Sequence, residues 1–207
     1  MPADMFKGWS EMLETVSEKL VELRPEYFQG KLSKVSYVGD CQYAVDSMNS
    51  YKELGLPPVL VQGDMWTNNM IYKVAMDNSA GSDLRAIIDW QKTHPGNMTE
   101  DLARALISSC SSKLRRNCAD MIFEYYHIKL KERMPKGEVP FTLEDVKRSY
   151  RRIMPYAMCF YIFGLPLMCA SPLVERENKE ERIEFLLDRG KCILDDVIAM
   201  DPENKDS

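Results

Sequence analysis

A short stretch with strand-like patterning lies inside a chain that otherwise shows helical periodicity, and it limits the folds open to this sequence. An apolar run at residues 58–61 precedes a polar loop, and two further apolar runs, 70–74 and 84–88, flank a turn-rich segment. This pattern is typical of a hairpin whose strands are joined by a long loop. The sequence therefore predicts an α+β fold, mostly helical, with a small β insertion.

Apolar residues at helical spacing predict helices on both sides of the insertion. Thr142, followed three residues later by Asp145, resembles a capping box and predicts where one of these helices begins. The expected helices cover residues 5–24, 40–54, 99–113, 117–133, 142–165 and 177–200.

One apolar run raises the question of a membrane helix. Residues 153–170 carry no charged side chain, and 18 residues is close to the minimum for a spanning helix. However, Pro155, Gly164 and Pro166 interrupt the run, and the sequence contains no second run of this kind. We therefore interpret it as a helix of the protein core.

Net charge and cysteine spacing argue against several classes of protein. The net charge of −5 argues against a general electrostatic attraction to nucleic acid or to an acidic membrane. The six cysteines include no Cys-x-x-Cys pair, and the chain has only two histidines, which argues against a zinc site or a disulfide framework. The first residues do not resemble a signal peptide. We expect a cytoplasmic protein with no nucleic-acid or membrane partner.

The polar loop carries the pattern that points to chemistry. Asp64 and Asn69 lie five residues apart between apolar strands, and Asp89 ends a later strand that a hairpin could return to the same loop. In kinases, an Asp and an Asn at this spacing orient the substrate hydroxyl and hold magnesium. Taken singly, each residue has an ordinary structural role as a turn residue, a cap or a strand-end carboxylate. The three together predict a phosphoryl-transfer site, active or ancestral.

The same segment resembles a known family. The resemblance covers most of the chain and identifies it with the CHK kinase-like (ecdysteroid-kinase-like) family, which is related to choline kinases and aminoglycoside phosphotransferases. The motifs that carry it are Gln62-Gly63-Asp64-Met65-Trp66-Thr67-Asn68-Asn69, Ile88-Asp89-Trp90-Gln91 and Glu100-Asp101-Leu102-Ala103-Arg104.

The resemblance implies an ATP-dependent and Mg²⁺-dependent kinase that phosphorylates a hydroxyl of a small molecule such as a steroid, choline or a xenobiotic. Asp64 would be the catalytic base, and Asn69 and Asp89 the magnesium ligands. Asp101 would support the site loops, or act as a first-turn carboxylate behind a Thr99 cap, and both roles can hold together.

The domain organisation follows from the resemblance. We expect a kinase-like C-terminal lobe over residues 1–200, with the catalytic segment at 58–104 and a frayed polar tail at 201–207.

Two departures from the family pattern qualify this interpretation. Gln62 and Gly63 open the loop where the family has His before Gly, and a Gln amide can replace some of the hydrogen bonds of that His. In addition, the ten glycines include no Gly-x-Gly-x-x-Gly and no β-meander precedes the loop, so we expect the N-terminal, nucleotide-clamping lobe to be absent. The chain is then expected to be inactive alone.

Several alternatives stay open from the sequence. The chain could be a non-catalytic pseudokinase that binds a protein partner or itself over the exposed lobe interface, or a fragment of a longer kinase. Trp66 and Trp90 flank the loop and could line a substrate pocket, although packing in the core is the more frequent role for such residues. His94 is interpreted as a loop residue.

Overall fold

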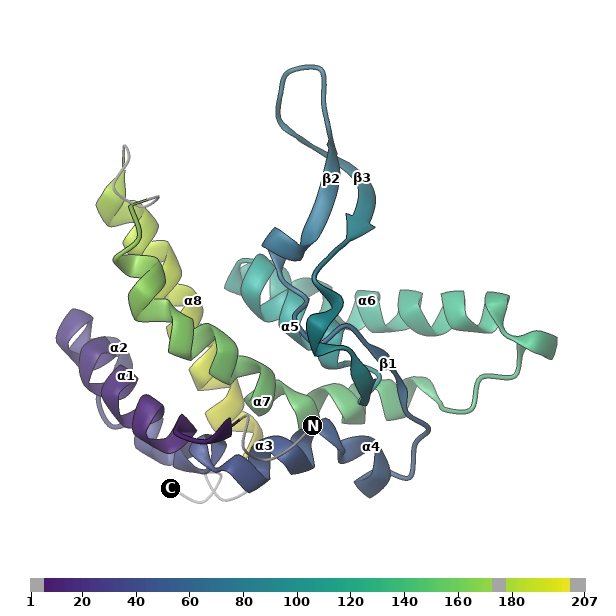
Figure 1. Ribbon diagram of the computed structural model, residues 1–207, viewed down its shortest axis with the longest axis horizontal. Coiled ribbons are helices and arrows are strands. Elements are labelled where there is room, and N and C mark those ends of the chain that lie inside the picture. The colour runs from purple at the N-terminus through teal and green to yellow at the C-terminus, as the bar shows by residue number, and fades with distance from the viewer. Residues whose placement is uncertain (1–5, 173–177, 202–207) are drawn as a thin grey trace.

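The computed structural model describes residues 6–172 and 178–201. Helices pack into one body, and a two-stranded hairpin extends away from it (Figure 1). The α-helices among these residues are α1 (Trp9–Leu23), α2 (Pro25–Phe28), α3 (Cys41–Met48), α4 (Ser50–Glu53), α5 (Glu100–Ser109), α6 (Ser112–Arg133), α7 (Leu143–Cys169) and α8 (Lys179–Met200). The strands are β1 (Val59–Val61), β2 (Met70–Val74), β3 (Ala80–Ile87) and β4 (His94–Gly96). The predicted α+β fold, mostly helical, is confirmed, while the expected tail falls almost wholly outside the described residues.

The longest helix, α7, runs through the helical body and contacts α1, α3, α5, α6 and α8. It begins at the predicted capping box, where Thr142 Oγ1 accepts the Asp145 N–H and Asp145 Oδ2 accepts the Thr142 N–H. The sequence predicts that this helix ends near residue 165. In the structure it continues past Pro166 to Cys169. A proline removes one backbone donor from a helix, and the burial of Leu165 and Cys169 on either side holds the helix together across this gap.

The same helix contains the apolar run that raised the question of a membrane span. Among the described residues, α7 is the one helix long and apolar enough to cross a membrane. Most of its apolar window is buried inside the protein, and Ile153, Met154 and Leu165 are fully enclosed. The run therefore forms the core helix that the sequence predicts.

The first helix packs on α7 with the predicted periodicity. Trp9, Leu13, Val16 and Leu20 are buried, whereas Met12 on the same expected stripe is exposed. The Trp9 ring contacts three aromatic side chains of α7, which are Tyr156, Phe160 and Phe163. These contacts place α1 against the helix that also lines the candidate site.

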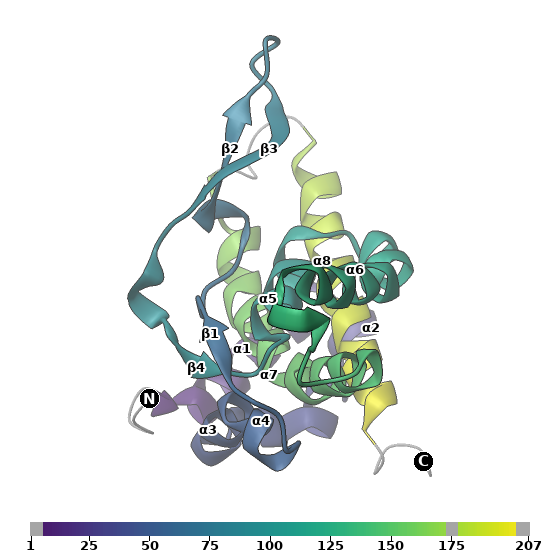
Figure 2. The same cartoon turned by 90° about the vertical axis from the view of Figure 1, so that its right-hand side faces the viewer.

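Two small antiparallel sheets carry the polar loop. In the predicted hairpin, β2 pairs with β3 so that Met70 lies opposite Ile87. The other sheet pairs β1 with β4, placing Val61 opposite His94 (Figure 2). The sequence gives no sign of β4, because a three-residue strand containing a proline lacks the alternation on which strand prediction depends. This pairing brings the residue before Gln62 next to the segment that leads into α5.

Candidate functional site

Gln62 occupies the centre of the polar loop. Its side chain is 1% exposed. Its Nε2 donates to the carbonyls of Ile88 and Asp89 at 2.9 and 2.8 Å, and its Oε1 accepts the Asp64 N–H at 2.8 Å. One amide thus ties the loop after β1 to the residues after β3. The Gln62 amide thus both donates and accepts hydrogen bonds at the position where the family has His.

Asp101, in the first turn of α5, fixes the start of the loop. Its two carboxylate oxygens accept the N–H groups of Gln62 and Gly63 at 2.8 and 3.0 Å. Gly63 has a φ of +85°, and a Cβ there would lie 2.6 Å from the Lys92 carbonyl oxygen, so the turn requires glycine. Thr99, in contrast, does not cap α5 with its side chain, because its hydroxyl donates to Asn97 instead.

Asp64 lies in a positively charged setting that the sequence did not reveal. Its Oδ1 accepts a hydrogen bond from Arg104 Nη2 and lies 3.3 Å from Lys92 Nζ. The Arg104 side chain is only 7% exposed, and its guanidinium lies 3.5 Å from the centre of the Phe160 ring. Burial lowers the pKa of Arg104 while the charge of Asp64 opposes this shift, and an arginine stays protonated in either case. These two cations fix the position of the carboxylate.

Asn69 and Asp89 meet this loop through backbone contacts. Asn69 Nδ2 donates to the Asp64 carbonyl at 2.9 Å, and the Asn69 carbonyl accepts the Ile88 N–H at 3.0 Å. Asp89, the next residue, has a φ of +58° and an exposed side chain. A non-glycine residue in this left-handed region is held there at a cost of about 1–2 kcal/mol. The structure therefore brings Asp64, Asn69 and Asp89 to one place.

The donor set of this cluster fits a magnesium ion that also binds phosphate. In the described part of the chain, no group of three or more His, Cys, Asp and Glu side chains is arranged so that it could hold a metal ion. The Asn69 amide oxygen accepts no hydrogen bond from another described residue, and the Asp89 carboxylate accepts only a long one from Gln91 at 3.4 Å. One amide oxygen and one carboxylate suit Mg²⁺, which takes few protein ligands and completes its shell with phosphate and water.

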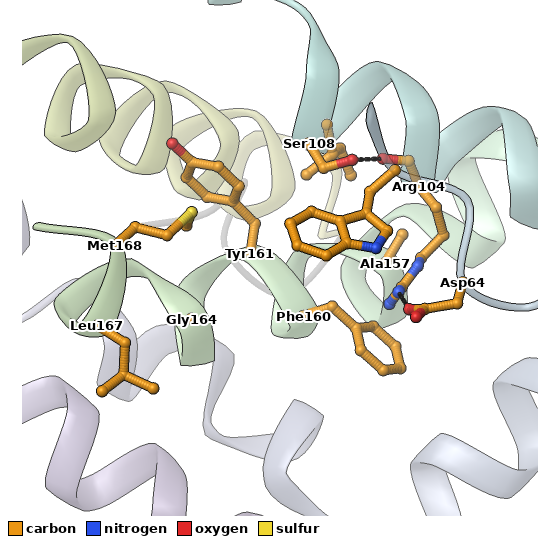
Figure 3. Close-up of a pocket in the computed structure, with 11 residues that line it drawn as sticks. Asp64, Arg104, Ser108, Ala157, Phe160, Tyr161, Gly164, Leu167 and Met168 are labelled. Atoms are coloured by element: carbon orange, nitrogen blue, oxygen red, sulfur yellow. Dashed lines mark hydrogen bonds and ion pairs between the residues drawn. The ribbon is translucent and has the colours of Figure 1, made fainter. Parts of the chain in front are cut away.

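A pocket of about 350 Å³ opens beside Asp64 (Figure 3). Asp64 and Arg104 lie at one end and Leu167 and Met168 at the other, so the charged groups of the lining are at the end that holds the candidate catalytic carboxylate. The remaining lining comes from residues of α5 and α7 and from one tryptophan. These residues are Trp66, Ile107, Ser108, Ala157, Phe160, Tyr161 and Gly164.

The two tryptophans differ in their relation to this pocket. Trp66 lines it, whereas Trp90 is not among the lining residues and its Nε1 donates to the Ile87 carbonyl at 2.8 Å. Their exposed fractions are 39% and 48%, so the core role that is more frequent for tryptophan is wrong here. Neither indole ring is fully covered by other described residues.

Three residues of the site region were not predicted as such, namely Lys92, Arg104 and His94. Arg104 is 40 residues from Asp64 in sequence, and only the packing of α5 brings them together. His94 is not a loop residue as expected, because it lies in β4 and is 8% exposed. The Glu100-Asp101 sequence in the first turn of an expected helix was the one signal that could have indicated a charged cluster at this helix start.

The fold and site describe a mostly helical α+β protein with a polar loop held over one end of α5. By sequence, the chain belongs to the DUF1679 family, which carries the description "Uncharacterized oxidoreductase dhs-27" and matches residues 2–205. No solved structure matches the chain.

Two curated relatives come from Caenorhabditis elegans. "Uncharacterized oxidoreductase dhs-27" is 30% identical over 175 residues, which is 78% of this chain and 21% of that protein. "Uncharacterized kinase-like protein D1044.1" is 25% identical over 200 residues, which is 92% of this chain and 50% of that protein. The chain therefore spans about a fifth of one relative and about half of the other.

Proposed function

We propose that this chain is the helical lobe of a CHK-type phosphotransferase that acts on a hydroxyl of a small molecule. The observation that carries the proposal is the joining of Asp64, Asn69 and Asp89 at one loop by the Gln62 amide and the β2–β3 pairing. The kinase-like relative supports the same class of activity. The oxidoreductase name belongs to a protein about five times longer than the matched part, and the glycines of this chain form no Gly-x-Gly-x-x-Gly dinucleotide motif.

Each residue then has a defined role. Asp64, which lines the pocket, orients the substrate hydroxyl and accepts its proton as the oxygen attacks the terminal phosphoryl group of ATP. Arg104 and Lys92 keep the carboxylate pointed at this position. Asn69 and Asp89 would hold Mg²⁺, which neutralises the phosphate charge when bound. Gln62 and Asp101 hold the loop backbone so that these groups stay aligned.

The pocket favours an uncharged and mainly apolar substrate over choline. Recognition of a quaternary ammonium uses a free aromatic face. Here the face of Phe160, the aromatic ring beside Asp64, is already covered by Arg104, with Lys92 Nζ 5.8 Å from the ring centre. This leaves Trp66 as the more open ring of the lining. Arg104 and Lys92 together also outweigh the single negative charge of Asp64 at this end of the pocket, and the excess positive charge would repel a cation. A steroid-like or other apolar alcohol is consistent with the remaining lining.

Calorimetric titration of Mg²⁺-ATP tests the nucleotide role of this loop. Any binding that the chain shows should be lost in Asp89→Ala and kept in the matched control Asp83→Ala, which removes an exposed hairpin carboxylate that pairs locally with Arg85. Binding that persists in Asp89→Ala would refute the assignment of the magnesium ligands. No binding up to millimolar ATP would show that this chain alone is not a kinase.

A non-catalytic, protein-binding role is the second candidate, and the projecting hairpin favours it. Five apolar side chains on β2, β3 and the loop between them are exposed, namely Ile71, Tyr72, Val74, Met76 and Leu84. An exposed apolar surface on a two-stranded sheet with open edges is typical of a contact site. Light scattering on the purified chain tests self-association. A dimer that becomes monomeric in Val74→Lys, but not in the helix control Leu114→Lys, would support this role.

A further inference from the structure

His94 lies between two hydrogen-bond acceptors in a nearly closed environment. Its Nδ1 is 2.9 Å from the Lys92 carbonyl oxygen, and its Nε2 is 3.2 Å from Glu100 Oε2. The exposed fractions of the His94 and Glu100 side chains are 8% and 1%. A carbonyl can only accept, and a carboxylate accepts, so each of the two contacts requires a proton. The His94–Glu100 pair is therefore complete only when it holds two protons in total.

The two members of this pair contact opposite sides of the candidate site. On one side, His94 holds the backbone of Lys92, whose Nζ lies 3.3 Å from Asp64 Oδ1 and whose carbonyl packs against Gly63. On the other side, Glu100 precedes Asp101, whose carboxylate accepts the N–H groups of Gln62 and Gly63. The pair thus links the segment that carries Lys92 to the helix turn that holds the loop.

We propose that His94 and Glu100 form a proton-holding pair that positions Lys92 against Asp64, so that loss of the proton weakens the Lys92–Asp64 contact. When the proton leaves, a ring nitrogen lone pair faces an acceptor in a site with little access to water, and the segment at residues 92–94 must move to relieve this contact. His94 is in this scheme a positioning residue. The importance of His94 for catalysis rests on the proposed function, whereas its effect on the Lys92–Asp64 contact does not.

The charges around the pair support retention of the proton. Burial lowers the pKa of His94, but the hydrogen bond and charge of Glu100, with a smaller effect of Asp101, outweigh it and raise the pKa above 6.5. Burial raises the pKa of Glu100, and the hydrogen bond and charge of His94, followed by the charge of Arg104, oppose this shift without cancelling it. From α7, Tyr156 lies close enough to the pair for the charge of Glu100 to add to the rise of the Tyr156 pKa, and β1 presents the apolar Val61 opposite His94.

Both shifts have the same consequence for pH. A raised folded-state pKa contributes stability below the unfolded-state pKa, and this stability is lost as the pH rises through the folded-state value. The contact that positions Lys92 is therefore expected to be complete near pH 6 and to weaken as the pH rises through the raised pKa of His94.

The chain offers a direct measurement, because His127 is its only other histidine. In the variant His127→Gln, which leaves the pair intact, an NMR titration of the ring reports His94 alone. We expect His94 to hold its proton above pH 6.5, and Glu100→Gln to lower the titration midpoint. A His94 titration midpoint at or below pH 6.5 that Glu100→Gln leaves unchanged would overturn the proposal.

The positioning is tested by a double-mutant cycle. Urea unfolding of Lys92→Met, Asp64→Asn and the double variant gives the coupling free energy between Lys92 and Asp64. The cycle is measured at about pH 6 and at about pH 9, which lie on either side of the range in which histidine changes charge. We expect a coupling that is weaker at the higher pH in the parent chain and independent of pH in His94→Gln. An equal coupling at both values in the parent would refute the positioning role. Neither measurement depends on kinase activity, so the failure of this proposal and of the proposed function can be told apart.

Discussion

Replacement of Gln62 by glutamate tests the central hydrogen-bond network of the site. The substitution Gln62→Glu keeps the size of the side chain and the oxygen that accepts the Asp64 N–H, but it removes both hydrogens donated to the carbonyls of Ile88 and Asp89. Because the position is 1% exposed, the new carboxylate would face two carbonyl oxygens with little water to separate them.

The magnitude follows from the two acceptors that lose their partner. A buried polar group left without its hydrogen bond costs about 1–3 kcal/mol, so two carbonyls give about 2–6 kcal/mol. Ile88 and Asp89 have exposed side chains, and water can reach part of this turn. We therefore expect the free energy of unfolding to fall by about 3 kcal/mol, toward the lower part of that range.

Urea unfolding followed by circular dichroism measures this loss. Burial and the two carbonyls raise the pKa of the introduced carboxyl group, so that it gains a proton, and one donor, as the pH falls. The difference from the parent chain should therefore shrink in mildly acidic solution. The control Gln29→Glu makes the same change at an exposed position and should alter stability by less than about 0.5 kcal/mol. A loss below about 1 kcal/mol at Gln62, or one that does not vary with pH, would refute the role of this amide.

Three further predictions follow from the same contacts. Gly63→Ala should cost about 3 kcal/mol by chemical denaturation, because strain and the contact with the Lys92 carbonyl act together, whereas Gly30→Ala, with positive φ but no close neighbour, should cost only about 1 kcal/mol. Thr142→Ala should lower the free energy of unfolding, measured by thermal denaturation, by about 1 kcal/mol through loss of the capping box. An unchanged free energy of unfolding would contradict that geometry. Gly164→Leu should fold normally, since the nearest atom to its Cβ is Met168 Cε at 3.8 Å, and should abolish binding of apolar alcohols measured by calorimetry.

Local patterns were sufficient to predict most of the helices and strands of the fold. The capping box of Thr142 and the periodicity of α1 depend on residues three or four apart, and such signals survive in any tertiary context. The same patterns could not predict that α7 continues past Pro166, because that depends on the core around Leu165. Strand β4 was missed for a similar reason, since its pairing with β1 is a contact between segments about 35 residues apart.

The candidate site could be predicted only in part. The spacing of Asp64 and Asn69 and the later Asp89 indicated which residues would meet, and the structure brings them together. The pairing of Asp64 with Arg104 has no local signature, because the two residues are joined by the placement of α5. Likewise, only the burial of His94 distinguishes it from an ordinary loop histidine.

The first turns of α5 explain why these separate features form one arrangement. Glu100 binds His94, Asp101 binds the N–H groups of the loop, and Arg104, one turn later, binds Asp64. Two carboxylates at a helix N-terminus are favoured by the helix dipole, so this turn can carry them without a side-chain cap from Thr99. Because Arg104 lies four residues after Glu100 and three after Asp101, and residues at these spacings are neighbours on a helix surface, the loop is held from a single rigid surface. A shift of α5 relative to β1 should therefore disturb all three contacts together, and substitutions at Glu100, Asp101 and Arg104 should be strongly non-additive in unfolding measurements.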